Sequence, residues 1–181
     1  MFKVDETVVY PGHGVARIDD VSEKIVAGNI VSFYKLSFLY KDMTVLIPLN
    51  SMRASGVRYL SEPTIVRKAL ATLEEEINIA RMCEFSASGW NKRQKEYMMK
   101  IQSGKLIDLA KAYRDLMSVS LKKELSFGER GILSTIEELF AQEIITARGM
   151  VREEVLRMIK KPFVQSEDPH EMPPPTTQFT L

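Results

Sequence analysis

The chain has very little of what metal sites and disulfide frameworks are built from. Its 181 residues include one cysteine, Cys83, and two histidines, His13 and His170. A single cysteine excludes an internal disulfide and a zinc site made of several cysteines. Two histidines so far apart have no metal-ligand spacing. We therefore expect no metal and no cofactor, and we interpret Cys83 as a small buried hydrophobic residue.

The sequence also lacks the motifs of common enzymes. It contains no glycine-rich phosphate-binding loop, and Gly12-His13-Gly14 is too short to be a dinucleotide fingerprint. No hydrolase elbow surrounds a serine. The consecutive acids Glu74–Glu76 would point in different directions on a helix, so they do not form a catalytic pair. These absences favour a protein that is not an enzyme. A hydrolase or transferase would need a pocket of converging polar groups.

Long apolar runs are missing as well. No stretch approaches the ~18 residues of a membrane span. Residues 1–6 lack the basic and then apolar pattern of a signal peptide. We therefore expect a cytoplasmic protein with no membrane segment. Its composition, 45% apolar and 27% charged, is typical of a globular chain that forms one large domain or two small ones.

The charge of the chain is small in total but unevenly distributed. The net charge is +1, yet residues 90–123 carry nine lysines or arginines against three acids. The flanking stretches 62–89 and 124–161 each hold more acids than cations. Because cations attract phosphates, a local positive excess of this kind is typical of a surface that contacts nucleic acid.

Residues 1–60 have the pattern of short β-strands. Thr7–Tyr10 is β-branched and aromatic, and the turn-forming residues Pro11–Gly14 end it. Gly28-Asn29 is typical of a short hairpin turn. Further strands are expected over about 15–26, 30–39, 43–47 and 56–60. So many strands in so short a segment must curl to bury their apolar face, which predicts a small SH3-like or Tudor-like barrel.

From residue 61 onward the apolar residues recur with the period of a helix. Ser126 and Glu129 form the pattern of a capping box at the start of one helix, and Gly104 is expected to end another. Helices are expected from about 62, from 90 to 101, from 105 to 123, from 127 to 148, and in a shorter piece to 161. The predicted fold is therefore α+β, with a β domain over 1–60 and an all-α helical domain over 61–161. A flexible, proline-rich acidic tail is predicted over 162–181.

The only tryptophan, Trp90, stands at an expected helix start. Small residues precede it, and Lys92, Arg93 and Lys95 follow within five positions. Such cations could hold phosphates while the ring wedges against unstacked bases. Alternatively, Trp90 is a core anchor on the same helical stripe as Tyr97, and the lysines form a solvated face, since large aromatic side chains are mostly buried. Composition leaves both interpretations open.

The chain also resembles a known family in several separated motifs. Val8–Ala16 is similar to the opening signature of the CarD/CdnL proteins, whose β domain is shared with the RNA-polymerase-interacting module of the transcription-repair coupling factor. The further motifs follow in the same order: Met43–Pro48, Gly56–Arg58, Gly89–Arg93, Gly104, Tyr113–Leu116 and Leu125–Glu129. The likeness covers about residues 1–148. Several motifs in the right order make it specific, whereas the Pro11–Gly14 turn alone would be weak.

The resemblance implies a bacterial transcription regulator that binds RNA polymerase and is not an enzyme. In this family the helical domain contacts promoter DNA at the upstream edge of the melted region, largely independently of sequence. The likeness makes Trp90 the wedge in the minor groove, which opposes collapse of the bubble and so stabilises the open complex. It also implies that Lys92, Arg93 and Lys95 hold the DNA backbone.

The Tudor-like domain of such proteins docks on the β subunit of RNA polymerase. The expected contact residues here are Lys24, Lys35, Thr44, Val45, Leu46 and Ile47. This sequence departs from many relatives at Leu46, where they carry a basic residue proposed to contact the polymerase. We expect docking by pairing at an exposed edge strand. The protein is expected to be a monomer, although an exposed edge could also drive self-association.

A second hypothesis is an adaptor that binds RNA polymerase without direct contact to DNA. In that case both domains bind proteins only, and Trp90 is packed inside the helical domain. The exposure of Trp90 distinguishes this adaptor from the DNA-contacting regulator.

Overall fold

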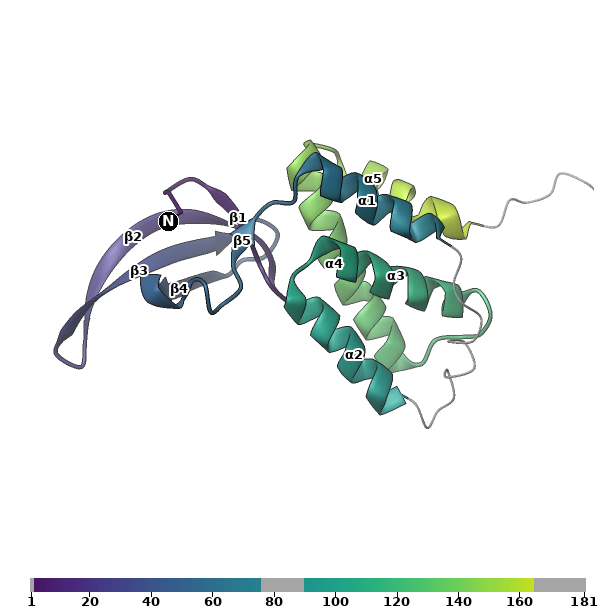
Figure 1. The fold of residues 1–181 in the computed structure, drawn as a ribbon, viewed down its shortest axis with the longest axis horizontal. Coiled ribbons are helices and arrows are strands. Elements are labelled where there is room, and N and C mark those ends of the chain that lie inside the picture. The colour runs from purple at the N-terminus through teal and green to yellow at the C-terminus, as the bar shows by residue number, and fades with distance from the viewer. Residues whose placement is uncertain (1, 76–89, 165–181) are drawn as a thin grey trace, which may run out of the picture.

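A computed structural model describes residues 2–75 and 90–164, which form an N-terminal sheet and a C-terminal group of helices (Figure 1). The strands are β1 (Thr7–Tyr10), β2 (Gly14–Val26), β3 (Asn29–Phe38), β4 (Thr44–Pro48) and β5 (Arg58–Tyr59), with the short 3₁₀ helix η1 (Leu49–Ser51) after β4. The helices are α1 (Pro63–Glu74), α2 (Trp90–Ser103), α3 (Leu106–Ser120), α4 (Phe127–Arg148), α5 (Arg152–Lys160) and the 3₁₀ helix η4 (Lys161–Phe163). The predicted α+β class is confirmed.

The sheet is antiparallel, with strand order β4-β3-β2-β1-β5. Its longest part is the β2–β3 hairpin, which curves away from the helices (Figure 1). Val26 pairs with Asn29, so the hairpin turn is Ala27-Gly28, one residue earlier than predicted. Both turn residues have positive φ, 49° and 80°. Positive φ at both central residues defines the type I′ turn that suits the twist of a hairpin.

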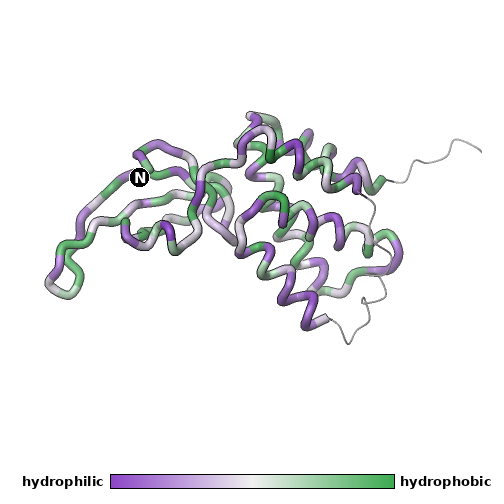
Figure 2. The backbone as a smooth tube through the Cα atoms, viewed as in Figure 1, coloured by the Kyte–Doolittle hydropathy of each residue, from purple (hydrophilic) through white to green (hydrophobic). Residues whose placement is uncertain are grey.

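Alternation along the strands builds the core of the β domain. Ile18, Tyr34 and Leu36 point to the same face and are buried, and Ile47 of β4 joins them. The successive side chains between them point to the opposite face, because side chains in a strand alternate. Beyond this core the hairpin tip carries exposed apolar residues, which Figure 2 shows as a hydrophobic end. The β domain thus has one covered face and one open face.

The helical domain has its own core, centred on Tyr113 of α3 and Phe140 of α4. Helix α4 begins with the predicted capping box: Ser126 accepts a hydrogen bond from the Glu129 amide, and the Glu129 carboxylate accepts one from the Ser126 amide. Phe163 lies edge-on against Tyr113, at 5.9 Å between ring centroids. The packed structure therefore continues past residue 162, where we expected the tail to begin. The rest of that tail, and Cys83, lie outside the described residues.

Candidate nucleic-acid interface

Trp90 is the first residue of α2 and is half-buried. One side of the indole rests on the start of α4, where a Cβ atom at Gly128 would lie only 2.9 Å from its Cζ2 atom. The ring also packs against the edge of the helical core. Trp90 is thus neither a fully buried core residue nor a fully exposed one. The indole is supported from one side by the helical domain, and part of it stays open to solvent.

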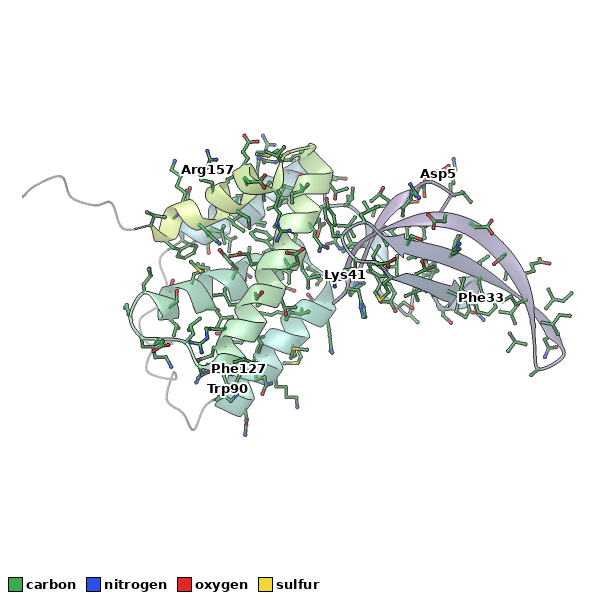
Figure 3. All side chains as sticks on the ribbon, turned by 180° about the vertical axis from the view of Figure 1, so that it is seen from behind. Asp5, Phe33, Lys41, Trp90, Phe127 and Arg157 are labelled. Carbon is green, nitrogen blue, oxygen red and sulfur yellow. The ribbon has the colours of Figure 1, made fainter. Side chains whose placement is uncertain are left out.

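Phe127 lies beside Trp90, and the two occupy the same end of the helical domain (Figure 3). The residue is 88% exposed, the largest exposed fraction of any large hydrophobic residue among those described. The sequence did not mark Phe127 as a candidate site residue, because its position was interpreted only as part of the capping box. The capping box nevertheless indicates where Phe127 points. Glu129 faces the interior, and a residue two positions earlier on a helix points to nearly the opposite side.

Lys92 and Lys95 are exposed on the first turns of α2, where they lie three residues apart on adjacent turns. This end of α2 is a hydrophilic stretch in Figure 2. Further along the same helix, Met98 is 40% exposed. The exposed surface of α2 therefore carries both cations and an apolar side chain.

Arg93 lies elsewhere than the sequence suggested. Only 7% of the residue is exposed, and its Nη2 atom is 3.5 Å from Oε1 of Glu129. The guanidinium carbon is 5.9 Å from the centre of the Trp90 ring, within the range of a cation–π contact. Arg93 therefore braces the tryptophan from inside the domain, and in this structure it does not present its charge to a DNA backbone.

Glu129 connects the start of α4 to this brace. It accepts a hydrogen bond from the Ser126 amide at 2.9 Å, and Lys123 Nζ lies 3.7 Å from its Oε1. Burial by itself raises the pKa of Glu129, but the hydrogen bonds to Ser126 and the charges of Lys123 and Arg93 outweigh it and lower the pKa below the ordinary value. Glu129 is therefore ionised at neutral pH, and it holds Arg93 in place beneath the ring.

The candidate polymerase-binding residues are brought together on the sheet. Lys35 is the cross-strand partner of Leu46, and Lys24 is that of Val31, so these side chains share the open face of the sheet. Thr44 lies on the same face. The other two candidates differ: Val45 is half-buried and Ile47 is buried in the core, so they offer mainly backbone groups. Since β4 is an edge strand, one side of its backbone is open to pairing.

Other kinds of site have little support in the described part of the chain. Residues 2–75 and 90–164 hold no group of three or more His, Cys, Asp or Glu side chains placed to bind a metal ion. Within the same ranges, no helix combines the length and apolarity needed to cross a membrane.

Comparison with known proteins agrees with this two-domain arrangement. Residues 2–61 match the model of the CarD-like/TRCF RID domain, and residues 82–160 match that of the CarD C-terminal domain. Over 155 residues the chain is 24% identical to the Bacillus subtilis (strain 168) protein "Putative transcription factor YdeB", an alignment that spans 86% of this chain and 97% of that relative. The two matched domains together define a transcription regulator. The chain belongs to the CarD/CdnL family.

Proposed function

We propose that this protein binds RNA polymerase and contacts promoter DNA at the upstream edge of the bubble, where Trp90 wedges into the minor groove and stabilises the open complex. The single observation that carries the proposal is the setting of Trp90. Its indole is braced from behind by Gly128 and Arg93, while the exposed Phe127 stands at the start of α4 next to Gly128.

A wedge between base steps must be both apolar and firmly held. Unstacking a base step costs about a few kcal/mol, and an inserted apolar side chain offsets part of that cost. A freely rotating side chain would lose conformational entropy on insertion. Because the Trp90 ring already packs against the helical core, much of that entropy has been lost on folding. Phe127 adds a second exposed aromatic ring at the same place.

Lys92 and Lys95 are suited to hold the DNA backbone next to the end of α2 that carries Trp90. Both are exposed, and they belong to the helix that Trp90 begins. Phosphate contacts position a protein on DNA but carry no sequence information. Binding by these side chains is therefore expected to be weak for DNA alone, and nearly independent of its sequence. Specificity for promoters then comes from the polymerase.

The polymerase contact belongs to the open face and edge of the β domain. Lys24, Lys35 and Leu46 lie on that face, and β4 offers a backbone edge for pairing with a strand of the β subunit. Leu46 makes the contact more apolar than a basic residue would. In this proposal a monomer docks through the sheet and reaches DNA through α2.

The adaptor without DNA contact remains the second candidate, because Trp90 does pack against the helical core. The two candidates differ in what happens to DNA beside the ring. A promoter carrying 2-aminopurine at the upstream edge of the bubble fluoresces more strongly when that base is unstacked. We expect wild-type protein to raise this signal in the polymerase complex and Trp90→Ala to raise it less, at equal occupancy of the polymerase. The adaptor predicts equal signals.

A further inference from the structure

The two domains are connected by an ion pair between Arg58 of β5, which is partly exposed, and the buried Glu143 of α4. The guanidinium makes two parallel hydrogen bonds to the carboxylate, Nη1 to Oε1 at 2.7 Å and Nη2 to Oε2 at 2.8 Å. The Glu143 side chain is 1% exposed, and the amide of Ser61 also donates to it at 3.0 Å. Arg58 Nε donates to the carbonyl oxygen of Gly104 at 2.8 Å. The Arg58 side chain therefore connects the sheet to α4 and to the residue that follows the end of α2.

Close packing surrounds this ion pair. A Cβ atom at Gly104 would lie 2.8 Å from Cγ of Pro11, and one at Gly14 would lie 2.2 Å from Oε1 of Gln142. Gly104 and Gly14 also have φ values of +64° and +108°, which side chains other than glycine rarely adopt. The two domains thus fit closely at these two glycines, with no space for a methyl group unless a neighbouring side chain moves.

Helix α2 extends from this contact to Trp90. It ends at Ser103, directly before Gly104, and it begins at Trp90. At 1.5 Å per residue, its length is about 20 Å. A rotation of roughly 10° at Gly104 would therefore move Trp90 by about 3.5 Å, which is close to the spacing of successive bases in a strand. Figure 1 shows the β2–β3 hairpin and the start of α2 extending to opposite sides of the contact.

We infer that this interdomain contact is a rigid lock, with Arg58 and Glu143 as positioning residues that set where Trp90 stands relative to the polymerase-binding sheet. A bidentate pair fixes the angle between its partners as well as their distance. Apolar side chains of similar volume could often replace such a pair without loss of stability, so we assign its main effect to the orientation that it fixes. The inference rests on the proposed function, since the lock is useful only if both ends of the molecule are engaged together.

The test combines a distance measurement with a functional one, in Glu143→Gln. Spin labels on Asn50→Cys and Gln94→Cys, in a Cys83→Ser background, report the distribution of distances between the domains. We expect a narrow distribution for the otherwise unchanged protein and a broader one for Glu143→Gln. In the unlabelled proteins, Glu143→Gln should bind polymerase and free DNA as wild type does. The factor by which Glu143→Gln prolongs the open-complex lifetime should nevertheless be about fivefold smaller than for wild type, which corresponds to about 1 kcal/mol.

Glu137→Gln is the matched control. Glu137 lies on the same helix, and its carboxylate accepts a hydrogen bond from the Tyr113 hydroxyl within the helical domain. Glu137→Gln should keep both the narrow distribution and the wild-type lifetime. If Glu143→Gln does not fold, Arg58→Lys keeps the positive charge but cannot make the two parallel hydrogen bonds to Glu143. It should then broaden the distribution and shorten the lifetime together.

Two results would overturn the lock: a distribution that stays narrow in the folded variant, or a broad distribution with a wild-type lifetime. Failure of the proposed function is a separate outcome. In that case the wild-type protein itself would leave the lifetime of the open complex unchanged.

Discussion

The indole of Trp90 rests directly on the backbone of Gly128. A Cβ atom at position 128 would come within 2.9 Å of the Cζ2 atom of the ring, closer than Cβ atoms approach other atoms in real structures. Glycine at this position is therefore what allows α2 and α4 to begin side by side with the ring between them. The direction of the indole depends on a residue far along the chain from Trp90.

Gly128→Ala is expected to displace the ring while leaving the fold intact, because a side chain at the start of a helix can rotate. As Trp90 is the only tryptophan, its fluorescence emission maximum should shift to longer wavelength. Gly131→Ala is the matched control, since a Cβ there meets no described atom within 4 Å. It should leave the emission unchanged and stabilise α4 by about 0.5–1 kcal/mol. Identical spectra for the two variants would show that Gly128 does not set the ring position.

Arg93→Met is expected to destabilise the protein by about 3 kcal/mol, at the low end for breaking a buried ion pair. The loss leaves the buried Glu129 carboxylate without its inner partner. In urea unfolding, this loss of stability should appear as a lower midpoint concentration of urea. Lys95→Met is the control on the same helix: it is exposed, so its midpoint should hardly change. Equal midpoints for Arg93→Met and wild type would mean that the ion pair between Arg93 and Glu129 does not stabilise the helical domain.

Acid should unfold the helical domain partly through Glu129. The folded-state pKa of Glu129 is lowered, so the unfolded chain binds the proton more readily than the folded one. The stabilisation is therefore present above the ordinary pKa of about 4.3 and is lost as the pH falls through the lower folded value. Glu129→Gln should flatten this part of a plot of unfolding free energy against pH. An unchanged slope between pH 5 and pH 3, roughly the window in which glutamates titrate, would contradict the assignment.

Binding to a DNA fragment should weaken with salt in proportion to the phosphates contacted. Each phosphate contributes roughly −0.9 to the slope of log K against log salt. Lys92→Ala and Lys95→Ala should each make the slope shallower by about that amount, while Lys68→Ala, an exposed lysine of α1, should not. Fluorescence anisotropy over a salt series gives the slopes. Equal slopes for all three variants would place the DNA elsewhere.

The sequence predicted best those features that depend on neighbouring residues. The capping box needs only Ser126 and Glu129, and the end of α2 at Gly104 needs only a residue free to adopt a φ of +64°. Both could be read directly. The hairpin turn was misplaced by one residue because Ala27 adopts a positive φ, which its side chain does not favour.

The rest of the candidate site depends on partners that are distant in sequence. Arg93 has the pattern of a surface cation, and only the position of Glu129 in the fold shows that it points inward. A phenylalanine is usually expected in a hydrophobic core, yet Phe127 is exposed. Arg58 and Glu143 lie 85 residues apart, so no local pattern could connect them.

The most direct test of the central claim is the lifetime of a promoter open complex formed by purified bacterial RNA polymerase. Wild-type protein is expected to prolong this lifetime. The factor of prolongation should be about tenfold smaller for Trp90→Ala bound equally well to polymerase, which corresponds to about 1.4 kcal/mol. Leu121→Ala, which changes an exposed leucine of the helical domain, should act as wild type. If polymerase-bound, folded Trp90→Ala prolongs the complex as wild type does, Trp90 is not the wedge and the proposed mechanism is wrong.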